Sequence, residues 1–174
     1  YNTGIFGSGP LINPSFHRNV FSSIENLTTM TEGDTASQRD IQMVSNFQTF
    51  LDQNQQEPFV GFLFFDAAHG YAPPEDYEPK FTPYWDRVDH IKLGPDFDPV
   101  PYKNRYKTAL HFVDSQIKNV IEDLKQRDLY NNSIIIITSD HGEEFNETKL
   151  NYWGHGSNFT PNQTQVPLLI IWPE

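Results

Sequence analysis

Apolar residues recur at helical spacing in two separate parts of the chain. In residues 35–56, TASQRDIQMVSNFQTFLDQNQQ, this spacing is kept by Ile41, Val44, Phe47 and Leu51. The segment follows Asp34, an expected N-cap, and is ended by Pro58. Residues 102–128 form the longer stripe, made by Tyr106, Val113, Ile117, Val120, Ile121 and Leu124. Charged residues lie opposite this second stripe, so both segments are predicted to be amphipathic helices.

Three short runs are apolar without a break and predict strands buried on both faces. They are FVGFLFF (59–65), IIIIT (134–138) and VPLLIIW (166–172). The glycine- and serine-rich residues 1–33 are expected to hold one edge of a sheet and the loop that leaves it. Strands that alternate with helices predict an α/β fold, with a mixed, mostly parallel sheet flanked by helices.

Residues 66–101 keep neither period and are rich in proline and aromatic side chains. A loop of this length is usually functional or disordered. It follows the first apolar run directly, so it begins where a strand is expected to end.

Composition narrows the classes of partner. A net charge of −11 without a dense Lys/Arg block argues against nucleic acid and suits a divalent cation better. The chain has no cysteine, which excludes disulfides, thiolate nucleophiles and Cys-zinc sites. No run approaches the ~18 apolar residues of a membrane helix. The chain opens on YNTGIFGSGP, without Met or signal features, so we expect a fragment whose signal or anchor lies elsewhere.

Candidate metal-binding and catalytic side chains follow two of the predicted strands. In open α/β sheets, ligands bind beyond the carboxyl ends of the strands. Asp66 and His69 come after the first run, and Asp140 and His141 come after the second. An Asp-His pair turned by a glycine can present a carboxylate oxygen and an imidazole nitrogen to one cation, as Zn²⁺ accepts and Mn²⁺ tolerates. His155 lies between two glycines further on.

Each of these candidates has a structural alternative. Asp140 and His141 can form an Asx-capped turn after a strand, and His69 or His155 can be an ordinary loop histidine. Glu143 and Glu144 are either neighbours of the metal ligands or solvated, and at least one is expected to be solvated. The remaining histidines lack a comparable setting and are assigned structural or surface roles: His17, His90 and His111.

The combined motif TSDHGEEF…WGHGSNFTPNQTQVPLLIIW resembles the carboxy-terminal signature of the alkaline-phosphatase superfamily, in its sulfatase, phosphoethanolamine-transferase and lipoteichoic-acid-synthase branch. The resemblance covers roughly residues 59–173 and implies a partial alkaline-phosphatase-like fold. It implies that Asp140 and His141 are metal ligands, for Zn, Mn, Mg or Ca. It further implies that His155 and His69, the latter in DAAHGYAPP, face the anion of the substrate.

The superfamily also needs an acidic ligand and a Thr, Ser or formylglycine nucleophile near the start of the domain. Thr3, Ser8 and Thr28 lack that context. We therefore interpret residues 1–174 as the C-terminal portion of one sulfatase-like domain without its nucleophile segment, and we expect this segment alone to be inactive.

A narrower resemblance depends on GIFGS (4–8) and VPLLIIWP (166–173). These segments recur in similar order in periplasmic sulfatase-like domains of Gram-negative inner-membrane proteins of the YejM/PbgA type. It implies a protein anchored by upstream helices, acting at the periplasmic face on a phospho- or sulfo-ester such as an envelope lipid head group. The implied activity is sulfuric-ester hydrolysis or phosphoethanolamine- or phosphoglycerol-type transfer. The alternative is a non-catalytic lipid-binding domain that regulates outer-membrane lipid, since a fold does not fix function. A metal-independent phosphoglycerate-mutase-like enzyme fits the spacing around His155 less well.

Overall fold

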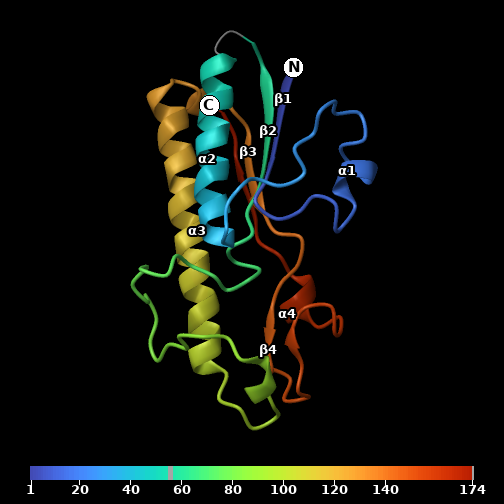
Figure 1. Cartoon of the computed structure of the whole chain (residues 1–174), viewed down its shortest axis with the longest axis vertical. Helices are drawn as coiled ribbons and strands as arrows, with labels where there is room; N and C mark the ends of the chain where they lie inside the picture. The colour runs from blue at the N-terminus through green and yellow to red at the C-terminus, as the bar shows by residue number, and fades with distance from the viewer. Residues whose placement is uncertain (55–56, 174) are drawn as a thin grey trace. The chain divides into compact units, whose positions relative to one another are not determined.

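The computed structural model describes residues 1–54 and 57–173 (Figure 1). The chain divides into two compact units. The first comprises Tyr1–Glu78 and Tyr106–Asp123, and the second comprises Pro79–Arg105 and the residues from Leu124 onward. The longest helix, α3 (Val100–Gln126), contributes to both units, and each unit is described by itself.

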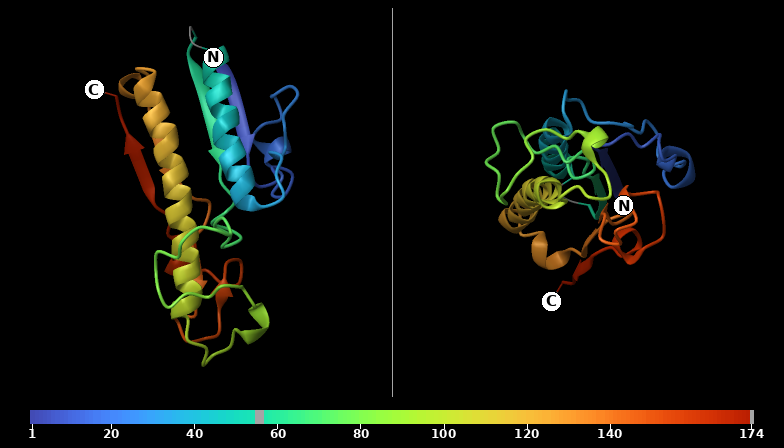
Figure 2. Two further views of the ribbon diagram at one scale, coloured as in Figure 1. Left: turned by 60° about the vertical axis from the view of Figure 1, so that its left-hand side comes forward. Right: turned by 90° about the horizontal axis from the view of Figure 1, so that it is seen from below.

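The first unit is built on a parallel strand pair. β1 (Asn2–Gly7) and β2 (Phe59–Phe64) are joined in register from Asn2 opposite Phe59 to Gly7 opposite Phe64. The connection between them contains α1 (Phe16–Asn19) and α2 (Ala36–Gln53). Figures 1 and 2 both show α2 alongside the strand pair, where Phe47 packs against Phe6 and Phe59. The predicted first helix is confirmed, and its predicted end at residues 55–56 lies outside the described residues.

Two details of that helix differ from the prediction. Thr35, not Asp34, is the N-cap, because its hydroxyl accepts from the Gln38 N–H while the Gln38 side chain accepts from the Thr35 N–H. Ile41 is 48% exposed, and Asp40 is fully buried instead. The helix face at this turn meets backbone N–H groups after β2, which require an acceptor rather than an apolar side chain.

The second unit contains two antiparallel strand pairs. β3 (Ile135–Thr138) pairs with β6 (Leu168–Ile171), and β4 (Glu144–Phe145) pairs with β5 (Trp153–Gly154). The short helices of this unit are η1 (His90–Lys92), η2 (Tyr130–Asn132) and α4 (Pro161–Thr164). A mixed α/β fold is confirmed, although one strand pair is parallel and two are antiparallel in the described part of the chain.

The strands predicted to be buried on both faces are partly exposed. Ile136 of β3 is 60% exposed and Leu168 of β6 is 67% exposed. Within the described residues each sheet has only two strands, and two strands leave part of their apolar surface uncovered. An apolar run indicates which surface a strand can bury, and the neighbouring elements decide how much of it is covered.

An aromatic cluster forms the core of the second unit. Tyr102, in the first turn of α3, is 1% exposed and lies edge-on to Trp85, with ring centroids 5.2 Å apart. The Tyr102 ring also meets Phe145 of β4 and Trp153 of β5. This cluster packs against the β4–β5 hairpin, which His155 follows directly. No helix in the described residues is long and apolar enough to cross a membrane.

Candidate active site

Asp140 and His141 follow directly after β3 and lie beside each other. The backbone N–H of His141 donates to Asp140 Oδ1 over 3.1 Å. His141 Nδ1 is 2.9 Å from the Gly142 carbonyl oxygen, which can only accept, so Nδ1 carries the proton and Nε2 carries the lone pair of the neutral ring. Nε2 lies 3.7 Å from Asp140 Oδ1. Both side chains are partly exposed, so the pair offers one carboxylate oxygen and one imidazole nitrogen, a donor set that fits a divalent cation.

His155 stacks on His141. Their ring centroids are 3.9 Å apart, with an interplanar angle of 28°. His155 Nδ1 lies 3.1 Å from Oε2 of Glu143, whose side chain is only 3% exposed. The carboxylate accepts a hydrogen bond from Nδ1–H, fixes the orientation of the ring and leaves Nε2 available for a ligand.

Two glycines allow the turns that carry these histidines to approach neighbouring backbone and side chains. A Cβ at Gly142 would lie 2.1 Å from the Asn162 carbonyl oxygen, and the Gly142 N–H donates to the Gln163 carbonyl over 2.8 Å. Gly154 has φ +83°, and a Cβ there would lie 3.3 Å from Glu143 Oε1. Larger residues at either position would displace the backbone next to a candidate ligand.

Glu144 is fully buried, and the Glu143 side chain is 3% exposed. The expectation that at least one of these two glutamates is solvated is therefore wrong. The Glu144 carboxylate accepts hydrogen bonds from four neutral side chains: Thr148, Asn158, Thr160 and Gln163. Burial raises the pKa of the Glu144 carboxyl, but these four bonds outweigh it and hold the pKa below its ordinary value. The signal in the sequence is the dense group of amide and hydroxyl residues between His155 and β6.

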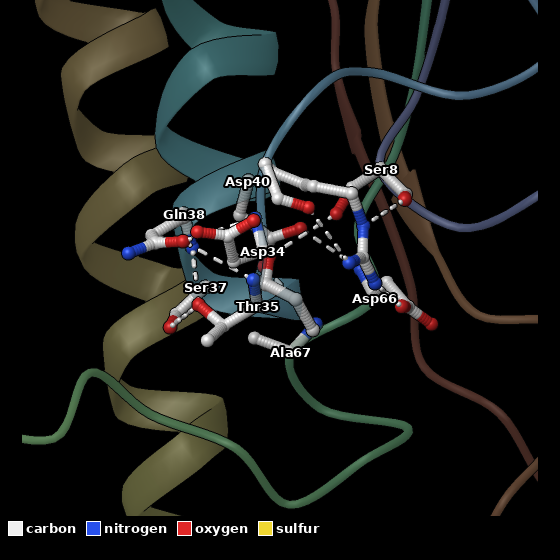
Figure 3. A network of polar contacts seen from close by, with 11 residues as sticks. Ser8, Asp34, Thr35, Ser37, Gln38, Asp40, Asp66 and Ala67 are labelled. Atoms are coloured by element: carbon white, nitrogen blue, oxygen red, sulfur yellow. Dashed lines mark hydrogen bonds and ion pairs between the residues drawn. The ribbon is translucent and has the colours of Figure 1, made fainter.

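His69 belongs to the first unit and lies on the turn that follows β2. Figure 3 shows how α2 holds this turn. The Asp40 carboxylate accepts the N–H groups of Asp66 and Ala67, and Arg39 Nη2 pairs with Asp66 over 2.8 Å. Burial raises the pKa of the Asp40 carboxyl despite the hydrogen bonds that it accepts. Sequence reasoning missed the role of this Arg-Asp pair, and the approach of His69 to the second unit's histidines stays a prediction.

The three remaining histidines make local contacts, which fits the predicted structural or surface roles. His17 Nδ1 lies 3.1 Å from the Leu11 carbonyl oxygen. His111 Nδ1 lies 2.6 Å from the Tyr77 hydroxyl, and the His90 ring packs against Tyr102.

Solved structures share the fold. The C-terminal periplasmic domain of EcEptC from Escherichia coli, in complex with zinc, matches with a TM-score of 0.68 and 20% identity, covering 100% of this chain and 49% of that one. The phosphonate monoester hydrolase of Agrobacterium radiobacter matches with a TM-score of 0.61 and 20% identity, over 81% and 34% of the two chains. The lipoteichoic acid synthase LtaP from Listeria monocytogenes matches with a TM-score of 0.56 and 14% identity, over 99% and 43%.

Two curated proteins are similar in sequence. The uncharacterized sulfatase YdeN of Escherichia coli K12 is 27% identical over 122 residues, which are 67% of this chain and 19% of YdeN. A low-salt glycan biosynthesis sulfotransferase of Haloferax volcanii is 25% identical over 135 residues, covering 68% of this chain and 33% of that protein. The chain thus spans less than half of the length of these relatives.

A family model extends the likeness to the entire sequence. The model of the sulfatase family, described as Sulfatase, matches residues 1–174. Together with the shared fold, this match confirms the predicted place in the alkaline-phosphatase superfamily, in its sulfatase and phosphoethanolamine-transferase branch. The chain belongs to the sulfatase family.

Proposed function

We propose that this chain carries part of the active site of a metal-dependent hydrolase or transferase of phospho- or sulfo-esters. In this proposal Asp140 and His141 are metal ligands, and His155 and His69 face the anionic group of the substrate. The sulfatase family consists of sulfatase-like hydrolases and phosphoester transferases, which supports the reaction class. The observation that carries the proposal is the 3.7 Å approach of His141 Nε2 to Asp140 Oδ1, with the lone pair set on that nitrogen.

A divalent cation bound by this pair would act as a Lewis acid on an ester oxygen and activate a hydroxyl nucleophile. Imidazole and carboxylate ligands together favour Zn or Mn over Mg or Ca. A zinc complex of the EcEptC domain is consistent with this choice.

The histidines would act on the anion itself. His155 is held by Glu143 at Nδ1, so its Nε2 can donate to a non-bridging oxygen when the ring is protonated. A donor held in place before the reaction stabilises developing charge without reorganising. We assign His69 the same role from the resemblance of its DAAHGYAPP segment to the superfamily loop.

The substrate class and location are inferred from the relatives. We propose an anionic ester, with an envelope lipid head group as the first candidate, handled at the periplasmic face of the inner membrane. Because the chain covers 49% of the EcEptC structure, we propose that turnover also requires residues outside it, including the nucleophile. The chain by itself should hydrolyse neither p-nitrophenyl phosphate nor p-nitrophenyl sulfate. Metal-dependent turnover lost in His141→Ala would contradict that expectation.

Metal binding is tested by titrating the 174-residue chain with Zn²⁺ and Mn²⁺ and following heat and thermal stability. A site with two protein ligands should bind weakly, and binding should fade in acid, because an imidazole must be neutral to ligate. Asp140→Ala and His141→Ala should abolish it. The matched controls Asp96→Ala and His90→Ala, both at exposed positions, should leave it unchanged. Equal binding in all four variants would remove the metal role from Asp140 and His141 and favour the regulatory alternative.

A further inference from the structure

The Glu144 carboxylate is buried among neutral donors. Its Oε2 accepts from Asn158 Nδ2 at 2.8 Å, Thr160 Oγ1 at 2.8 Å and Gln163 Nε2 at 3.0 Å. Its Oε1 accepts from Thr148 Oγ1 at 2.9 Å. Burying a carboxylate is costly unless its lone pairs are satisfied, so this group organises the side chains that satisfy it.

Three of these four donors lie just after His155, and one of them reaches both histidine turns. Gln163 accepts the Gly142 N–H through its backbone carbonyl, next to His141. Its side chain accepts the Ser157 N–H at 3.3 Å and donates to Ser157 Oγ at 2.9 Å, two residues after His155. Glu144 therefore holds the side chain of Gln163, a residue whose backbone bonds the His141 turn and whose side chain bonds the His155 turn.

We propose that Glu144 is a positioning residue that sets the stacking of His155 on His141. Its four described hydrogen bonds go to Thr148, Asn158, Thr160 and Gln163 rather than to either ring. It acts through Gln163, Asn158 and Thr160, which fix the segment that carries His155 at the 3.9 Å ring separation. The catalytic importance of this ring separation rests on the proposed function. Under that proposal, the stacking places the ring that faces the anion next to the ring that binds the metal.

A positioning role for Glu144 differs from a general role in stability. A matched pair of substitutions distinguishes these two roles. Thr160→Val removes a donor on the Oε2 side, toward His155, and Thr148→Val removes the donor on the Oε1 side. Each deletes one hydroxyl bond to the same carboxylate at nearly constant volume. Only Thr160→Val should disturb the ring pair.

Glu144→Gln is the conservative variant. Its amide oxygen can take the place of Oε2 as the acceptor on that side, while its NH₂ group donates to the Thr148 hydroxyl. Glu144→Ala removes every one of these bonds. The ring pair should survive the first change and be lost in the second. Glu147→Ala, three residues away, is the stability control, because Glu147 accepts from the Phe145 N–H and Lys103 instead.

The test measures two quantities in the 174-residue chain: the ring-current shifts of the His141 and His155 imidazole protons by NMR, and Zn²⁺ affinity by calorimetry. Glu144→Ala and Thr160→Val should move the ring signals, and Glu144→Ala should weaken Zn²⁺ binding by about 10- to 100-fold. Glu144→Gln, Thr148→Val and Glu147→Ala should keep the stacked signals.

The proposal is overturned if Thr160→Val leaves the ring signals in place, or if Thr148→Val or Glu147→Ala moves them as far. Should Glu144→Ala not fold, the two threonine variants decide alone. A wild-type chain that binds no Zn²⁺ would refute the metal role under the proposed function. The ring signals would still decide the role of Glu144, because they are measured without metal.

Discussion

At the scale of single residues, proton placement on two imidazoles defines the site. A carbonyl accepts a hydrogen bond from Nδ1–H of His141, and the Glu143 carboxylate accepts one from Nδ1–H of His155. Both rings therefore leave Nε2 available for a ligand, although one acceptor is neutral and the other is charged. Two chemically identical side chains 3.9 Å apart can in this way take different roles.

Gly142→Ala should damage the site more than any other single-methyl change around it. The new Cβ would lie 2.1 Å from the Asn162 carbonyl oxygen, which belongs to backbone and cannot rotate away. Overpacking of this kind costs about 1–3 kcal/mol in unfolding free energy. Urea unfolding followed by tryptophan fluorescence measures it.

The matched control is Gly94→Ala in the same unit, where a Cβ meets nothing within 4 Å. It should stay within about 0.5 kcal/mol of wild type. Equal effects of the two substitutions would show that the Gly142 turn relaxes without cost.

At the scale of elements, the candidate groups lie where strands end and helices begin. Asp140 and His141 follow β3, while His69 follows β2 on a turn bound by Arg39 and Asp40 of α2. The exact start of α2 therefore matters for the site, because one turn separates its N-cap from the Arg-Asp pair.

Thr35→Ala should remove the capping box of α2 and cost about 1 kcal/mol of stability. The substitution removes the hydrogen bond that the Gln38 N–H donates to the Thr35 hydroxyl. It also weakens the reciprocal bond that the Thr35 N–H donates to the Gln38 side chain. Thr49→Ala, exposed in the same helix, is the control and should be within about 0.5 kcal/mol of wild type. Thermal unfolding followed by circular dichroism compares them, and a Thr35→Ala midpoint equal to that of the control would refute the role of the cap.

At the scale of the whole molecule, two buried carboxyls should contribute in opposite senses to the acid response of the two units. The pKa of Glu144 in the second unit is lowered from 4.5, so its contribution is complete above pH 4.5 and is lost as pH falls through the folded-state pKa. The pKa of Asp40 in the first unit is raised from 3.8, so its contribution is complete below pH 3.8 and is lost as pH rises through the folded-state pKa.

The three tryptophans, Trp85, Trp153 and Trp172, all belong to the second unit, so their fluorescence follows that unit. Urea unfolding measured by fluorescence between about pH 3 and 6 should show a loss of stability in acid that Glu144→Gln reduces. For Asp40→Asn, circular dichroism should show a stability difference from wild type that changes with pH in the opposite sense. Parallel pH profiles for wild type and both variants would contradict these assignments.

The sequence by itself determined the two long helices, the three strand runs, the α/β class and the family motif. These depend on local periodicity and on residues adjacent in the chain, such as Asp140 and His141 at the end of an apolar run. Tertiary structure alone decided that Asp40 rather than Ile41 faces inward, that Glu143 holds His155, and that Glu144 is buried among four donors. The physical reason is that a polar side chain is buried only when partners distant in sequence satisfy it, and no local pattern records where those partners lie.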